Sequence, residues 1–246
     1  MNNRLPATTP AALTDVLATA TGTSHRDDPV TGRTGGPAGN ARLTAWSGLL
    51  LLGGFLAECV TLISLRSMLA AHIVLGAFLV PLVLLKTATT GWRILRYYLG
   101  SAAYRRAGPP PLLLRLLGPL VVFTGLAVLG SGLALVALGP ATFTPIFTAG
   151  GVRIDPLTVH QASFVAWLAV TGLHVLARTV PAVQIAAGSK PQRHRVPGVT
   201  SRVATLLLTA TLGAAVSAVV LHRAGDWTSP GSARSPGVGD GQRAPR

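Results

Sequence analysis

The sequence predicts an all-α integral membrane protein, a bundle of about five transmembrane helices. Two observations predict this fold class. The 246 residues have a mean hydropathy of +0.52, and only 11% of them are charged, which is too apolar and too poor in charge for an ordinary soluble domain. Five apolar runs also reach the roughly 20 residues that a helix needs to cross the hydrocarbon core of a bilayer. The expected location is the plasma membrane, as a multi-pass protein.

The formal net charge of +14 would suggest nucleic-acid binding in a soluble chain. Here the basic residues cluster in the gaps between the apolar runs, which is the pattern of charges that anchor helices at a membrane face. Lipid is therefore the expected partner, and nucleic acid is not. The one cysteine, Cys59, lies inside an apolar run, so neither a disulfide framework nor a cysteine-based metal site is expected.

The apolar runs give the expected helices in chain order. Their approximate bounds are 43–65, 69–92, 112–138, 157–180 and 203–222. Residues 1–42 lack the apolar stretch of a signal peptide and are expected to form a disordered cytoplasmic tail. Residues 43–222 form the predicted helical bundle. Residues 223–246 are rich in proline, glycine and serine and are expected to form a disordered tail outside the membrane.

The connections between the runs differ in positive charge, and this difference predicts the orientation. Basic residues concentrate between the second and third runs and between the fourth and fifth runs. Because positive residues favour the cytoplasmic side, both connections and the N-terminus are expected inside, and the C-terminus outside. The basic residues of these two connections are Arg93, Arg96, Arg105, Arg106 and Arg115, then Lys190, Arg193, Arg195 and Arg202.

Ionisable side chains within the runs are candidate functional residues, because such groups are costly at membrane depth. His160 and His174 are 14 residues apart, which places them about 21 Å apart along a helix and nearly on one face. His72 lies at the same depth in the second run as His160 in the fourth, and Lys86 follows His72 at the same spacing. The sequence therefore predicts a pair His72 and His160 near the outer face, and a pair Lys86 and His174 near the inner face.

Two imidazoles on facing helices of a bundle can take both axial positions of a haem iron. His72, His160 and His174 are therefore the candidate metal ligands, and Lys86 completes the predicted cofactor-binding residues. A flat macrocycle also needs small residues on the helix faces around it. Glycines in the first three runs can provide such surfaces, namely Gly53, Gly54, Gly76, Gly125, Gly130 and Gly132.

With these histidines, residues 43–180 resemble the b-type cytochrome subunits that anchor membrane-bound formate dehydrogenases and nickel-iron hydrogenases. The resemblance implies a four-helix core that carries two b-type haems, to which the last run adds a C-terminal helix. It implies that His72 and His160 bind the outer haem and that His174 binds the inner one. The family has its remaining ligand, a histidine, on the first helix, where this sequence has none. One haem is therefore expected, and a second would have Lys86 or a weak ligand opposite His174.

Simpler roles stay open for each of these residues. A histidine near a helix end can lie at the membrane interface, and Lys86 can extend its amine to the cytoplasmic headgroups. Glu58 can either handle a proton at a quinone site or remain a neutral, hydrogen-bonded carboxyl group. Trp46 and Trp92 fit an inner interfacial belt, and His222 an outer one.

The expected function is an electron-transfer subunit that links a quinone pool to a redox partner subunit, rather than a catalyst that acts alone. The sequence contains no phosphate-binding glycine loop or nucleophile elbow, so a hydrolase or an ATP-driven machine is not expected. The alternative is a cofactor-free membrane protein, either a structural anchor or a small transporter. A transporter would show broken helices at mid-membrane depth, and Pro81 is the only interruption predicted.

Overall fold

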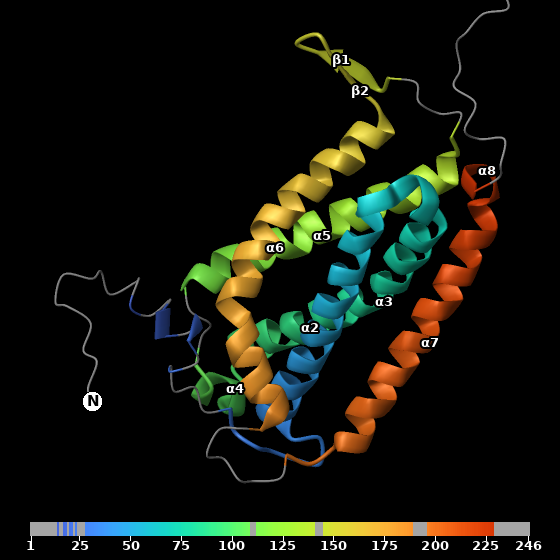
Figure 1. Ribbon diagram of the computed structural model, residues 1–246. Helices are drawn as coiled ribbons and strands as arrows, with labels where there is room; N and C mark the ends of the chain where they lie inside the picture. Colours follow the sequence, from blue (N-terminus) through green and yellow to red (C-terminus); the bar gives the residue numbers. More distant parts are fainter. Residues whose placement is uncertain are drawn as a thin grey trace, which may run out of the picture.

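A computed structural model of the chain describes residues 14, 17–18, 20–21, 23, 28–108, 112–140, 145–188 and 196–228. This part of the chain is predominantly helical (Figure 1). The long helices are α2 (Gly36–Thr61), α3 (Leu65–Tyr98), α5 (Leu112–Leu138), α6 (Pro156–Ala187) and α7 (Val199–Arg223). The short elements are the 3-10 helix η1 (Leu62–Ser64), α4 (Ala102–Arg106), α8 (Gly225–Thr228), and strands β1 (Phe147–Ala149) and β2 (Val152–Ile154).

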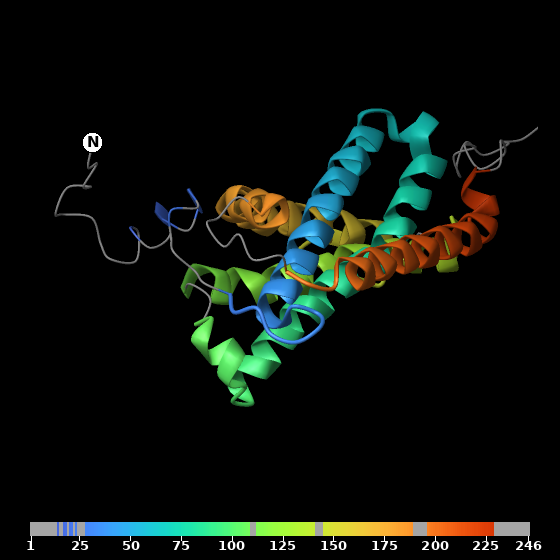
Figure 2. The same ribbon diagram turned by 90° about the horizontal axis from the view of Figure 1, so that it is seen from below.

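Four stretches of the described chain are long and apolar enough to cross a membrane, the first being Gly36–Tyr98. That stretch contains α2, η1 and α3, and the two long helices fold back against each other. Near one end Asn40 Nδ2 donates to the Thr89 carbonyl over 3.0 Å, and near the other Thr61 Oγ1 lies 3.0 Å from His72 Nδ1. Helices α2 and α3 are therefore antiparallel, and η1 is the turn between them (Figures 1 and 2).

Helix α2 begins at Gly36, before residue 43 where the apolar run predicted its start. Pro37 occupies the first turn, where its fixed φ suits a helix and its missing N–H is not needed. The preceding Gly35 has a φ of 86°, a conformation that favours glycine. Residues 36–42, which the sequence assigned to a disordered tail, are therefore the first turns of a helix. The rest of that tail lies mostly outside the described residues.

The guanidinium of Arg202 on α7 holds the start of α2 in place. It is 4% exposed and donates to the carbonyls of Thr34, Val196 and Pro197 over 2.9–3.2 Å. It also lies over the Trp46 ring, 5.7 Å from its centroid. Trp46 is therefore packed between helices, whereas Trp92 is 51% exposed as an interfacial tryptophan would be. Removal of Arg202 would leave three carbonyls without this donor.

A short β-hairpin connects α5 to α6, an element that the all-α prediction did not include. Strands β1 and β2 are antiparallel and pair Phe147 with Ile154. Gly150 and Gly151 form the turn with φ values of 54° and 80°, and two consecutive positive φ values are the signature of a tight hairpin turn. In Figure 1 the hairpin and α4 lie at opposite ends of the bundle.

The interior is small, and large apolar side chains cover much of the outer surface. Leu51 of α2 and Leu79, Leu82 and Val83 of α3 form the buried cluster. By contrast, many leucines, valines and phenylalanines on the long helices are exposed, for example Phe123 at 73%. A surface this apolar is expected where hydrocarbon replaces water as the solvent.

Helix α7 packs closely against α3 through its small residues. Ser217 Oγ donates to the Val74 carbonyl over 2.9 Å, and Gly213 faces Phe78. Small residues at such contacts allow helix backbones in a membrane to approach each other. Prolines do not break the long helices: Pro81 lies inside α3, and Pro119 and Pro181, which the sequence analysis did not count as interruptions, lie inside α5 and α6.

The contact at Gly213 can be tested with an alanine substitution. A Cβ at this position would lie 2.8 Å from the Phe78 carbonyl oxygen, so Gly213→Ala should push α7 away from α3. We expect a loss of about 1–3 kcal/mol in stability, seen as a lower midpoint of thermal unfolding of the purified protein. Gly172→Ala is the control, because a Cβ there meets no atom within 4 Å. Equal midpoints for both variants would contradict close packing at Gly213.

Candidate functional site

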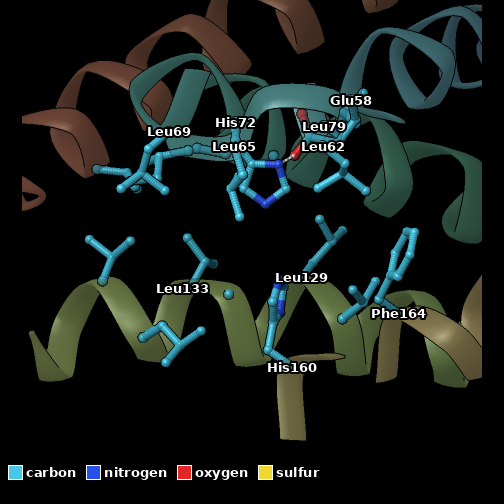
Figure 3. Close-up of a pocket in the computed structure, with 18 of the residues that line it drawn as sticks. Glu58, Leu62, Leu65, Leu69, His72, Leu79, Leu129, Leu133, His160 and Phe164 are labelled. Atoms are coloured by element: carbon cyan, nitrogen blue, oxygen red, sulfur yellow. Dashed lines mark ion pairs between the residues drawn. The ribbon is translucent and has the colours of Figure 1, made fainter. Parts of the chain in front are cut away.

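The two predicted outer histidines face each other across the bundle. His72 projects from α3 and His160 from α6, and the centroids of their rings are 6.4 Å apart. Figure 3 shows the two rings pointing toward one another from opposite sides of a gap that leucine side chains border. The structure therefore brings together the first predicted pair, although residues 72 and 160 belong to helices far apart in the sequence.

The gap between the two rings is a cavity of about 380 Å³, within the range of small-molecule and cofactor sites. Helices α2, α3, α5 and α6 form most of its wall, and Val220 of α7 and Trp227 of α8 also line it. Apart from the two histidines, Glu58, Cys59 and Arg66, the lining is mainly apolar, and includes Phe55, Leu62, Leu79, Leu129, Phe164 and Trp167. The cavity thus has a mainly apolar wall into which two imidazoles project.

The hydrogen bonds of His72 identify which of its ring nitrogens is free. Its Nδ1 lies 3.0 Å from both Glu58 Oε1 and Thr61 Oγ1. The Thr61 hydroxyl already donates its proton to the Glu58 carbonyl over 2.6 Å, so its oxygen can only accept from His72. Nδ1 therefore carries a proton, and Nε2 takes no part in these hydrogen bonds. In Figure 3 that second nitrogen points toward His160.

His160 repeats this arrangement with a different partner. Its Nδ1 lies 3.0 Å from Ser131 Oγ, and the Ser131 hydroxyl donates to the Val128 carbonyl over 3.1 Å. The serine oxygen is then available to accept from Nδ1, and Nε2 of His160 takes no part in these contacts. Metal-binding histidines characteristically donate their other ring N–H to an acceptor of this kind. Both rings therefore have Nδ1 engaged by a neighbouring helix and Nε2 outside those contacts.

The distance between the rings fits one metal ion between them. A nitrogen lies about 1.1 Å from the centroid of an imidazole ring, and metal–imidazole bonds are about 2.0–2.1 Å long, so two collinear ligands place the centroids about 6.3 Å apart. The observed distance is 6.4 Å. Within the described residues, no three His, Cys, Asp or Glu side chains lie close enough to hold a metal ion. The pair can therefore supply two ligands, and the remaining positions of a metal would have to come from a cofactor.

Of the glycines predicted to make room, Gly132 does so most directly. A Cβ there would lie 3.1 Å from His160 Cε1, and at Gly76 it would lie 3.3 Å from Glu58 Oε1. Gly54 instead accommodates Leu79, and a Cβ on Gly125 would make only ordinary contact with Trp167 at 3.7 Å. Gly53 and Gly130 face open space. Gly132 and Gly76 therefore leave room for the His160 ring and the Glu58 carboxyl group.

The second predicted pair lies further along the same two helices. Lys86 Nζ donates to the Thr44 carbonyl of α2 over 2.6 Å, so its amine is held against α2. The charges of Lys86 and Arg178 both act on His174. The buried Nδ1 of His174 has no hydrogen-bond partner among the described residues. Binding of a second haem by His174 and Lys86 stays a prediction.

Sequence reasoning missed Thr61 and Ser131, the hydroxyl partners of the two histidines. Hydroxyl side chains are common in membrane helices, and nothing in their spacing connects residue 131 with residue 160. The remaining histidines add nothing to the site. His222 is exposed near the end of α7, as expected for an interfacial residue, and His25 and His194 lie outside the described residues.

Comparison of the chain with protein-family models, with curated proteins and with solved structures finds no match. What this site does must therefore follow from its own residues.

The cavity can be tested through its own cysteine, Cys59, which is partly buried in the wall. Trp227 also lines the cavity and is held in place by a 3.2 Å hydrogen bond from its Nε1 to the Leu135 carbonyl. Because thiol reactivity depends on access, Trp227→Ala should raise the rate of Cys59 alkylation by a membrane-permeant maleimide several-fold. Trp92→Ala, which removes an exposed tryptophan elsewhere, should leave the rate unchanged. An unchanged rate of Cys59 alkylation in Trp227→Ala would contradict the view that Trp227 shields Cys59.

Proposed function

We propose that this chain is a multi-pass plasma-membrane cytochrome that holds one b-type haem between His72 and His160. In this proposal it passes electrons between a quinone pool and a redox partner subunit. The observation that carries the proposal is the facing pair of imidazoles, whose Nδ1 atoms are both engaged and whose ring centroids are 6.4 Å apart. The quinone and the partner subunit follow from the family resemblance, and lipid contact follows from the apolar helix faces.

The donor set favours haem over a bare metal ion. Two neutral imidazoles leave most coordination positions of a metal unfilled, and a porphyrin fills them with its own nitrogens. Bound haem supplies one-electron redox chemistry of iron. The chain would hold the His72 ring through Glu58 and Thr61 and the His160 ring through Ser131, and these two imidazoles would bind the haem. The apolar wall would exclude water and so influence the redox potential.

Five membrane-spanning helices are part of this proposal. The long helices contain 25–34 residues, so each is at least about 37 Å long and can cross a hydrocarbon core of about 30 Å. Successive long helices run in alternating directions through the bundle (Figure 1). Arginines gather near the α4 end, where α2 also begins, so we assign that end and the N-terminus to the cytoplasm and the end of α7 to the outside.

Substitution of either outer histidine should abolish haem binding. We expect His72→Ala and His160→Ala each to lose the low-spin b-type spectrum while the protein stays inserted, because a bis-imidazole site cannot survive with one imidazole. The measurement is the visible spectrum of the purified protein together with its haem-to-protein ratio, expected near one in the parent. His222→Ala is the matched control and should keep the full spectrum. A parent without haem would favour a cofactor-free membrane protein instead.

Cysteine labelling tests the orientation. In a Cys59→Ser background, a single cysteine at Arg105 should be protected from an impermeant thiol reagent in intact cells and should react after permeabilisation. A cysteine at Gly150, in the β1–β2 turn, should react in intact cells because that turn lies at the opposite end of the bundle. Labelling of the Arg105 position before permeabilisation would show that the assigned orientation is reversed.

A further inference from the structure

One stripe of α6 presents polar side chains to the interior beyond the haem site. Thr171, His174 and Arg178 follow each other at helical spacings of three and four residues, so they share one face. Thr171 is 9% exposed, and its Oγ1 has no hydrogen-bond partner among the described residues; the same holds for His174 Nδ1. Buried polar atoms without partners cost free energy, so their presence indicates that a further group belongs at this face.

Lys86 adds a second positive charge beside Arg178. The two charges act on each other, and both act on His174. The Lys86 amine is held between Thr44, whose carbonyl it bonds, and Gly48, where a Cβ would lie 2.8 Å from Nζ. On the α2 side, Thr44 Oγ1 is another buried atom without a partner in the described structure. The cluster thus brings polar groups of α2, α3 and α6 together around Lys86 and Arg178.

The protein does not neutralise these cations within its described part. No ion pair there includes Lys86 or Arg178, and the acid whose charge reaches Arg178 is Asp28. Asp28 is already bound by Arg93, whose Nη1 and Nη2 both donate to its carboxylate. Arg93 itself adds a like charge near Arg178. Since like charges in a partly buried site repel, an anion is needed to balance them.

The depth of the cluster indicates where that anion comes from. Lys86 lies 21 residues after Leu65, or about 31 Å along α3, and Arg178 lies 22 residues after Pro156, or about 33 Å along α6. A hydrocarbon core is about 30 Å thick, so both cations lie near the headgroup level opposite to the haem site. Basic pockets between helices at this level suit lipid phosphates.

We propose that Lys86, His174 and Arg178 form a binding site for the phosphate group of an anionic phospholipid. The two cations supply charge-assisted hydrogen bonds to the phosphate oxygens, and Thr171, Thr44 and His174 offer the unpartnered polar atoms. The 14 residues between His72 and Lys86 separate the two sites by about 21 Å along α3, so this lipid site does not depend on the haem proposal.

Thermal unfolding of the full chain in a non-ionic detergent tests the site. Phosphatidylglycerol should raise the unfolding midpoint of the parent by about 5 °C or more beyond the effect of phosphatidylcholine, because a ligand that binds only the folded state stabilises it. Arg178→Gln and Lys86→Met should lose this difference, and Arg178→Lys should keep part of it. Arg106→Gln, which removes an exposed charge on α4, should behave as the parent.

Four results would overturn the proposal, three from the unfolding experiment and one from haem content. One is equal stabilisation of the parent by the two lipids, and another is a full phosphatidylglycerol response in an Arg178→Gln variant that remains helical and monodisperse. The third is an equal response to inorganic phosphate, which would replace the lipid by a free anion. The haem content of the parent provides a separate check. If the parent binds a haem that His174→Ala removes, this cluster is a haem site and not a lipid site. This result does not depend on whether His72 and His160 also bind a haem.

Discussion

The organisation of this chain follows from one constraint: polar groups at membrane depth must find their partners inside the protein, because hydrocarbon offers none. The side-chain contacts between helices follow that constraint. Ser217 bonds the Val74 carbonyl, Asn40 bonds the Thr89 carbonyl, and Lys86 bonds the Thr44 carbonyl. Each contact connects two long helices at a defined register. The polar residues therefore determine the register in which the helices pack. The apolar residues determine only that the helices lie in the membrane.

The same constraint explains why the two histidines differ from other polar residues of the bundle. Their Nδ1 atoms are satisfied by Glu58, Thr61 and Ser131, but each Nε2 faces a largely apolar cavity. A protein that needed only to bury two imidazoles would satisfy both nitrogens. The glycine beside His160, Gly132, leaves the ring room to keep this orientation. The pair of imidazoles that face each other is therefore the part of the structure on which the proposed function rests.

Sequence reasoning could predict the helices well, because length and apolarity alone determine which segments suit a membrane. The run 112–138 coincides with α5, and the other runs differ from their helices only at the ends. It missed the turns of α2 before residue 43, where Pro37 and Gly35 set the start of the helix and apolar content does not. It also missed the β1–β2 hairpin, which depends on two adjacent glycines and only three residues in each strand.

For the candidate site, helical spacing could place His72 with His160 and Lys86 with His174, since helix geometry is regular over 14 residues. It could not supply their surroundings. The contact of Thr61 with His72 depends on the tight turn η1, and that of Ser131 with His160 depends on how α5 crosses α6. Lys86 turns toward α2 because the carbonyl of Thr44 is accessible there beside Gly48. Tertiary contacts of this kind leave no periodic signal in the sequence.

The hairpin of α2 and α3 also has a consequence for how the chain enters the bilayer during synthesis. A lysine amine without a hydrogen-bond acceptor is costly wherever the surroundings of a membrane helix are apolar. Here the acceptor, the Thr44 carbonyl, precedes Lys86 in the sequence and is therefore synthesised first. The turn η1 then lets α3 fold back against α2. When α3 leaves the ribosome, α2 already offers the carbonyl that its lysine needs. The order of residues along the chain thus favours insertion of these two helices as one unit.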